Sequence, residues 1–307
     1  FWLKPSAPQA SQPSNLSPFL GPAAFPPCLE NMGGCMQPIQ KKGEVSEKLP
    51  TIDEAGKVSF GCIAREWRCK FAEDAGKLSL TKAQELFERY ESQVKAVPQV
   101  KRVQRIVCGG CLDFKVIISA PAAAFPDWGA KKFEPEEAFL KDLAEIDGIT
   151  SIETQSYTLT EILPIQTGGV VPEKLPTVDE AGTVSFSCIA REWRCKFSDE
   201  AGKLALTKAQ ELLEKYESQI KAVPHVKNVQ RIVCGGCLDF KVIISAPAVA
   251  FPDWEATKFE PEEAFLKELA EIDGITSIER SSSRRRRSSR SLPRSAASLP
   301  STRRPTL

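Results

Sequence analysis

The sequence has one histidine, two methionines and no long apolar run among its 307 residues. A membrane-spanning helix needs roughly 18 or more consecutive apolar residues, and no segment reaches that length. The scarcity of histidine weakens every interpretation that needs an imidazole as a base or a metal ligand. With 42% hydrophobic and 26% charged residues, the composition is otherwise that of an ordinary globular protein. We therefore expect a soluble protein, and an intracellular location is favoured.

Acidic residues are missing from the end of the chain. The segment 280–307 has nine arginines and no Asp or Glu, whereas residues 47–279 carry a net charge of −9. The overall net charge of +1 hides this asymmetry. Only the basic, Ser/Arg-rich tail is expected to bind polyanions such as nucleic acid or anionic lipid, because its field attracts them without sequence specificity. For the rest of the chain, the charge pattern does not identify a protein or small-molecule partner.

The leader, residues 1–46, is also unusual in charge. Residues 1–29 are rich in Ser, Pro and Ala, with no acidic residue and only Lys4 as a base. An organelle transit segment normally has several basic residues, so a disordered leader is favoured and organelle targeting is the alternative. The chain begins at Phe1, which is consistent with a fragment or a processed product.

An internal repeat dominates the rest of the sequence. Segments 47–153 and 173–279, of 107 residues each, differ at 16 positions. We expect a first repeat over 47–165, a linker over 166–172, and a second repeat over 173–279 whose last strand is truncated where the disordered tail, 280–307, begins. The single histidine, His225, is matched by Gln99 in the first repeat. A site shared by both repeats therefore cannot depend on it.

Each repeat reads as strand, helix, two strands, helix and strand. In the first repeat these elements are predicted at 57–71, 81–97, 100–107, 112–119, 134–147 and 149–162. The order βαββαβ predicts the ferredoxin-like fold, an α+β class with an antiparallel sheet. We expect two tandem ferredoxin-like modules, flanked by disordered tails. Two such modules could pack sheet to sheet as a paired α+β barrel, since each exposed sheet face needs a cover.

The motif Cys-Gly-Gly-Cys stands between two predicted strands in both repeats. Glycine accepts the positive φ of a two-residue hairpin, so a tight turn is expected at Gly109–Gly110. The antiparallel pairing should also bring the end of the first strand to this turn. The cysteines that would then converge are Cys69, Cys108 and Cys111 in the first repeat and Cys195, Cys234 and Cys237 in the second.

Three interpretations of these cysteines are open. Buried thiols or a disulfide need no further function, because free cysteine is among the most buried residue types. A metal site, with zinc or iron, would use the six cysteines as ligands, but a fourth ligand is missing from each set. Thioredoxin-like redox chemistry is disfavoured, because the motif opens a strand and lacks the helix N-terminus that lowers a thiol pKa.

Other motifs are candidates for binding. The run Arg-Glu-Trp-Arg-Cys, from Arg65 to Cys69, could form a cation–π or anion-binding strip, or be a sheet-packing tryptophan with exposed arginines. Glu66 and Asp113 are candidates for an acid or base. An RNA recognition motif has the same element order, but it needs aromatic residues on two strands, and the third predicted strand offers only Phe114. We therefore expect that the repeats do not bind nucleic acid.

Three stretches, REWRCKF, CGGCLDFKV and IDGITSIETQSYTL, resemble uncharacterised tandem-repeat proteins of dinoflagellate-type algae. The resemblance covers about residues 47–279 and implies an algal source but no activity.

From the residues we predict a non-catalytic binding or scaffold protein. The alternative is a paired α+β barrel enzyme or small-molecule binder with a cavity between the sheets. An apolar pocket lined by Trp67 and Phe114 would favour the alternative, and a solidly filled interface would favour the scaffold.

Overall fold

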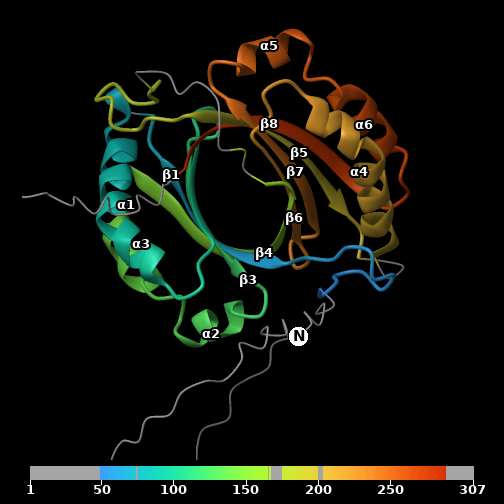
Figure 1. Ribbon diagram of the computed structural model, residues 1–307. Coiled ribbons are helices and arrows are strands. Elements are labelled where there is room, and N and C mark those ends of the chain that lie inside the picture. The colour runs from blue at the N-terminus through green and yellow to red at the C-terminus, as the bar shows by residue number, and fades with distance from the viewer. Residues whose placement is uncertain (1–48, 74, 165, 167–174, 200–202, 288–307) are drawn as a thin grey trace, which may run out of the picture. The chain divides into compact units, whose positions relative to one another are not determined.

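The computed structural model (Figure 1) describes residues 49–73, 75–164, 166, 175–199 and 203–287, with the backbone alone for Ala75 and for 285–287. The predicted leader, nearly all of the predicted linker and the tail beyond Arg287 lie outside these residues. The repeats follow the predicted ferredoxin-like order, with one additional short helix in each.

The first repeat consists of β1 (Cys62–Phe71), the 3-10 turn η1 (Ala75–Lys77), α1 (Leu78–Ala96), β2 (Arg102–Cys108), β3 (Asp113–Pro121), α2 (Phe125–Ala130), α3 (Glu136–Ala144) and β4 (Ile149–Leu163). The second repeat consists of β5 (Cys188–Phe197), α4 (Leu204–Ala222), β6 (Asn228–Cys234), β7 (Asp239–Pro247), α5 (Phe251–Ala256), α6 (Glu262–Ala270) and β8 (Ile275–Arg287). The additional helices, α2 and α5, begin at the Phe-Pro-Asp-Trp runs.

The eight strands form one closed antiparallel barrel in the order β1-β3-β2-β8-β5-β7-β6-β4, visible as a ring in Figure 1. Closure removes every free sheet edge, which would otherwise expose unpaired backbone groups. Both repeats contribute four strands to it. The two modules therefore share one barrel.

The long strands β4 and β8 join the two repeats. The first part of β4 pairs with β1, and its last part, from Thr158 to Leu163, pairs with β6. β8 does the same, pairing with β5 and then with β2 through residues 284–287. The predicted truncation of the last strand at 279 is wrong, because strand pairing uses backbone groups and so tolerates the Ser/Arg-rich side chains of β8.

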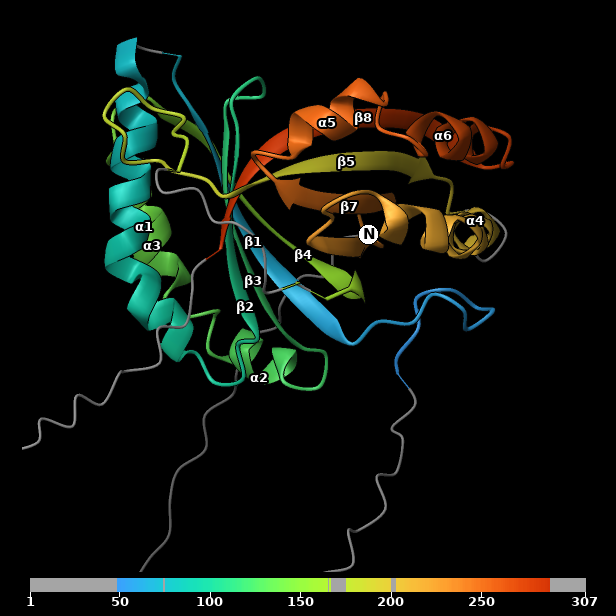
Figure 2. The same cartoon turned by 45° about the horizontal axis from the view of Figure 1, so that its top comes forward.

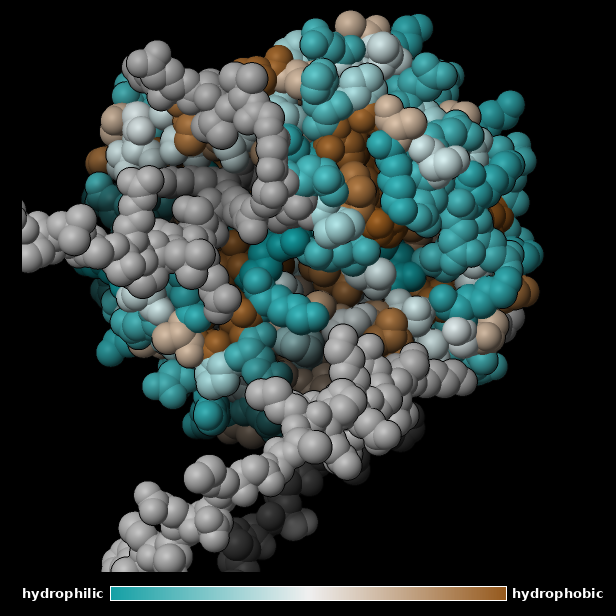
Figure 3. Space-filling view, in the orientation of Figure 1, coloured by the Kyte–Doolittle hydropathy of each residue, from teal (hydrophilic) through white to brown (hydrophobic). Residues whose placement is uncertain are grey.

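The helices cover the outside of the barrel. α1 and α3 lie over the strands of the first repeat, and α4 and α6 lie over those of the second (Figure 2). Side chains alternate between the faces of each strand, so that Phe114, Val116 and Ile118 pack under the helices while Ile117 faces the interior. The outer surface over α4 and α6 is hydrophilic (Figure 3). None of the helices described is long and apolar enough to span a membrane.

Short N-terminal arms, residues 49–60 and 175–186, are exchanged between the repeats. Val58 of the first arm belongs to the core under α4, and Val184 of the second arm belongs to the core under α1. Asp53 accepts a hydrogen bond from the hydroxyl of Thr207 at 2.9 Å, and Asp179 accepts the equivalent bond from Thr81. Each repeat therefore completes the hydrophobic core of the other.

Candidate functional site

A cavity of about 290 Å³ lies inside the barrel, where the inner faces of the two repeats meet. Its walls are mainly charged and polar. Both repeats supply equivalent side chains to it: Glu66, Arg68, Lys115 and Ile117 from the first, and Glu192, Arg194, Lys241 and Ile243 from the second. Enclosed cavities with a few convergent polar groups are the usual form of small-molecule sites.

Strand alternation explains why these charges point inward. Arg65 and Trp67 face outward, where the carboxylate of Glu136 accepts hydrogen bonds from the Arg65 guanidinium at 2.7 Å and from the Trp67 indole at 2.6 Å. The intervening residues, Glu66 and Arg68, must then face the interior. The Arg-Glu-Trp-Arg run thus fastens α3 to β1 with one face and supplies the cavity with the other.

Two buried aspartates close ion-pair clusters at the cavity wall. Asp239 accepts hydrogen bonds from the Arg194 guanidinium at 2.7 and 3.0 Å, and the ammonium of Lys196 lies 3.1 Å away. Burial by itself would raise the pKa of Asp239. The hydrogen bonds from Arg194 and Lys196 outweigh this effect, so the pKa of Asp239 is lowered. The first repeat has the same cluster, formed by Arg68, Lys70 and Asp113. These aspartates are occupied by cations and are poor candidates for a general acid, which corrects the expectation for Asp113.

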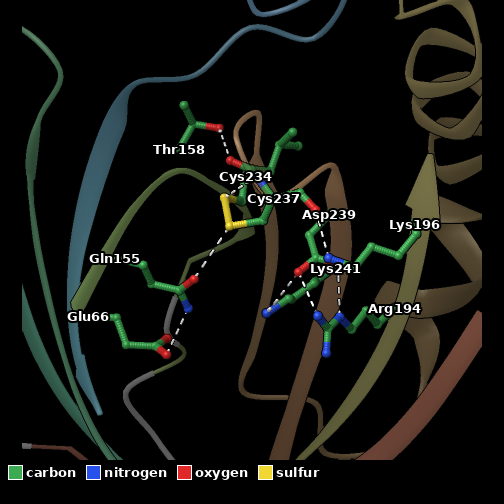
Figure 4. Close-up of a disulfide and its surroundings, with 10 residues drawn as sticks. Glu66, Gln155, Thr158, Arg194, Lys196, Cys234, Cys237, Asp239 and Lys241 are labelled. Carbon is green, nitrogen blue, oxygen red and sulfur yellow. Dashed lines mark hydrogen bonds and ion pairs between the residues drawn. A yellow bond between two sulfur atoms is a disulfide. The ribbon is translucent and has the colours of Figure 1, made fainter. Parts of the chain in front are cut away.

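Glu66 is buried and Glu192 is half-buried, and the two glutamates have different environments (Figure 4 shows Glu66). The carboxylate of Glu66 accepts hydrogen bonds from the Tyr157 hydroxyl and the Gln155 amide, both at 2.9 Å. In the second repeat Ser281 is paired with Glu192 in the place of Gln155. Within the described part of the chain, no group donates a hydrogen bond to Glu192. A carboxylate in the cavity wall is therefore available to a ligand.

Lys241 lies close to this free carboxylate. Lys241 stands on β7 directly opposite Arg194 of β5. Arg194 follows Glu192 by two residues, so all three side chains lie on the same face of the sheet. The Lys241 side chain is 12% exposed, and its ammonium lies 3.9 Å from Asp239. Burial lowers the pKa of Lys241, and the nearby Arg194 and Lys115 act in the same direction, while Glu192 and Glu66 oppose them. An amine with a lowered pKa can act as a base or nucleophile.

The cysteines do not converge as the sequence suggested. Cys69 is buried on the helix side of the sheet, whereas Cys108 lines the cavity on the opposite side. Burial raises the pKa of Cys69 to about 12. Across the residues that the structure describes, no group of three His, Cys, Asp or Glu side chains could hold a metal ion. The three-cysteine geometry is wrong because strand alternation separates Cys69 from the turn, and zinc or iron binding stays a prediction.

The Cys-Gly-Gly-Cys turns also differ from the expectation. The loop runs from Gly109 to Leu112, between the paired residues Cys108 and Asp113, and the positive φ falls on Leu112, at 53°. In this turn the backbone N–H of Cys111 donates to the Cys108 sulfur at 3.2 Å. Both thiols are free, and burial raises the pKa of Cys111 to about 11.

The matching turn of the second repeat contains a disulfide. Cys234 and Cys237 are bonded to each other, with Cys195 free and buried on the helix side. The Cys237 sulfur lies 3.7 Å from the amide oxygen of Gln155, whose nitrogen holds Glu66 (Figure 4). The turns therefore border the cavity wall.

No protein-family model and no curated protein matches this sequence. Similar solved structures include a putative monooxygenase from Fusobacterium nucleatum, 10% identical, covering 73% of this chain and 92% of that chain, with a TM-score of 0.47. A mutant chlorite dismutase from Candidatus Nitrospira defluvii is 11% identical, covering 74% and 91%, with a TM-score of 0.39. An uncharacterized ferredoxin fold protein related to antibiotic biosynthesis monooxygenases, from Listeria monocytogenes, is 11% identical, covering 73% and 94%, with a TM-score of 0.32.

The prediction of a non-catalytic scaffold is wrong, because the sheets surround a cavity where a scaffold would have a filled interface. The cavity is not the apolar pocket by which the alternative was to be recognised, since Trp67 and Phe114 pack under the helices. Sequence reasoning missed Glu192 and Lys241, although their alternation with Trp193, Phe240 and Val242 carried the signal.

Proposed function

We propose that this chain is a small-molecule binder or enzyme of the paired α+β barrel type, which takes a small polar molecule into the barrel cavity. The observation that carries the proposal is the carboxylate of Glu192, to which no side chain in the described residues donates a hydrogen bond, beside the buried amine of Lys241 in the barrel cavity. A charged group inside a protein reduces its stability when its hydrogen-bonding capacity is not used, so a bound partner is a physical reason for the presence of such groups.

The size and charge of the cavity limit the ligand. A volume of about 290 Å³ is at the lower end of the range for ligand pockets, roughly 300–1,000 Å³. The walls offer cationic and anionic groups together, so the ligand should combine hydrogen-bonding groups with a compact shape. Large apolar compounds are excluded by the charged walls and by the volume.

The two repeats supply a matched experiment. The double variant Ser281→Gln with Ser283→Tyr copies into β8 the residues that hold Glu66 in β4, at equivalent register positions. The new side chains should fill part of the cavity and donate hydrogen bonds to Glu192. We expect small carboxylic acids, oxo acids or amino acids to raise the melting temperature of the wild-type chain but not of this variant.

The reciprocal variant, Gln155→Ser with Tyr157→Ser, serves as the control. It leaves Glu66 without its donors and enlarges the cavity, so ligand binding should be retained. If no member of the panel stabilises the wild-type chain, or if ligands stabilise the filled variant equally, the cavity is not the binding site and the proposal fails.

A further inference from the structure

We propose that Lys241 forms a covalent imine with a small aldehyde or ketone in the barrel cavity. This inference rests on the proposed function and names the chemical class of its ligand. Three features carry it: an amine inside the cavity, a weak ion pair that leaves the amine accessible, and a free carboxylate within the same wall.

The ion pair of Lys241 is weak because its partner is already occupied. The ammonium lies 3.9 Å from Asp239, beyond hydrogen-bond distance. Asp239 instead accepts bonds from Arg194 at 2.7 Å and lies 3.1 Å from the Lys196 ammonium. In Figure 4 the Lys241 side chain leaves β7 toward the side of the cavity where Gln155 and Glu66 lie. The amine is therefore directed into the space that a ligand would fill.

The amine must lose its proton before it can attack a carbonyl carbon. Burial lowers the pKa of Lys241, and this increases the neutral fraction at a given pH. The charged groups that act on it are Glu192 and Arg194 of β5, Glu66 of β1, Lys115 of β3 and Asp239 of its own strand. The cations among them disfavour a further positive charge, as in other lysines that form imines.

The free carboxylate completes the chemistry. The neutral amine adds to the carbonyl carbon, so that a C–N bond forms and the C=O π bond becomes an alkoxide. Glu192 carries both N–H protons to this oxygen in turn: the first gives the carbinolamine hydroxyl, and the second lets that hydroxyl leave as water when the C=N bond forms. One carbonyl and one amine give one imine and one water, and no oxidant or reductant is required.

The first repeat provides an internal reference. Lys115 occupies the position of Lys241, but the carboxylate beside it, Glu66, is held by the Tyr157 hydroxyl and the Gln155 amide. The Lys115 ammonium also lies nearer to its aspartate, 3.7 Å from Asp113. Lys115 therefore lacks a free proton acceptor, and it should react more slowly than Lys241 in the same molecule.

The test is reductive trapping in the full chain. The protein is incubated with glyoxylate or pyruvate and sodium cyanoborohydride, and the products are followed by intact mass and peptide mapping. We expect one main adduct, on Lys241, at severalfold or more the level on surface lysines, because a lowered pKa raises the neutral fraction of the amine at a given pH. Lys241→Arg should abolish it, while Lys208→Arg, on the exposed face of α4, should leave it unchanged.

The outcomes separate the imine from simple binding. Adducts spread evenly over the lysines, or an adduct that persists in Lys241→Arg, overturn the imine. Stabilisation by the same oxo acids without any adduct also overturns it but leaves the cavity as a binding site. If Lys241→Arg fails to fold, the peptide map of the wild-type chain decides alone, because Lys115 reports the background within the same sample.

Discussion

Asp53 shows how a single side chain joins the two repeats. Its carboxylate accepts bonds from the backbone N–H of Val58 at 2.7 Å and of Lys57 at 3.2 Å, as well as from Thr207. The two backbone bonds shape the arm, and the third attaches the arm to α4 of the other repeat. Burial disfavours the ionised carboxyl, but the bonds from Val58 and Thr207 outweigh it, and the pKa of Asp53 is lowered.

We predict that Asp53→Asn reduces the free energy of unfolding at neutral pH by about 1–3 kcal/mol, the usual loss for a buried hydrogen-bonded group. A carboxyl whose pKa is lowered on folding stabilises above its ordinary pKa of 3.8. That stability is lost as the pH falls through the lower, folded value. The deficit of the variant should therefore shrink below about pH 4.

Urea unfolding of the wild type and of Asp53→Asn between pH 3 and pH 7 measures this difference in the free energy of unfolding. Lys208→Arg, which alters an exposed position of α4, is the control and should follow the wild type throughout. A deficit that stays constant across the whole range would contradict the role of the ionised carboxyl.

The difference between Glu66 and Glu192 could not be found by sequence reasoning alone. The repeats are nearly identical, so Glu66 and Glu192 look equivalent in the sequence. Their environments differ because β4 and β8 diverge, and only the pairing register shows that Ser281 lies opposite Glu192 where Gln155 lies opposite Glu66. Glu192 is available to a ligand because β8, the strand that the sequence predicted to be truncated, places Ser281 opposite it.

At the scale of elements, β8 decides whether the barrel closes. Its residues 275–285 pair with β5, and its last residues, 284–287, pair with β2 of the first repeat. The sequence predicted instead that this strand is truncated at residue 279, since Ser and Arg are not typical strand residues. The backbone of β5 and β2 would lose its partners without this strand, which gives the Ser/Arg-rich segment a structural role up to Arg287.

We predict that a chain ending at Glu279 loses much of its stability, because it removes strand pairing to both β5 and β2. A chain ending at Arg287 keeps all the pairings described and should match the full chain. Thermal unfolding followed by circular dichroism compares the three proteins. Equal melting temperatures for the chains ending at 279 and 287 would show that β8 does not close the barrel.

The starts of α1 and α4 also depend on the arms. Thr81 and Gln84 have the spacing of a capping box, yet α1 begins earlier, at Leu78, after Lys77 in the left-handed region. The Thr81 hydroxyl instead donates to Asp179 of the exchanged arm at 2.9 Å. A residue that reads as a local cap therefore makes a contact between repeats.

At the scale of the whole molecule, the two repeats form one interdependent unit. They share the barrel, exchange arms and line one cavity, so neither repeat is complete alone. The same contacts could form between two copies of one repeat, because the repeats differ at so few positions. This arrangement resembles a symmetric dimer joined into one chain.

We predict that residues 47–166 alone form a dimer, in which β4 of each copy pairs with β2 of the other and the arms are exchanged. Size-exclusion chromatography with light scattering measures the mass. Asp53→Asn in this shorter chain should weaken the dimer, since the arm contact lies between copies. A stable folded monomer would contradict the interdependence of the repeats.

The sequence by itself determined most elements of each repeat and the alternation of side chains between the two faces of each strand. These follow from neighbouring residues: a period of two in strands such as Phe114–Ile118, and helical spacing in α1. The prediction of the ferredoxin-like α+β fold is confirmed. The similarity of the two repeats also limited any shared site to residues present in both copies.

Only the tertiary structure decided which residues meet. Cys69 and Cys108 lie on opposite faces of one sheet, β8 closes the barrel despite its composition, and Glu192 lacks the donors that Glu66 has. Each of these depends on pairing between segments far apart in the chain, as when β4 pairs with β6 or β8 pairs with β2. Local propensity contains no information on such partners, because closure of the barrel and burial of the whole inner face select them together.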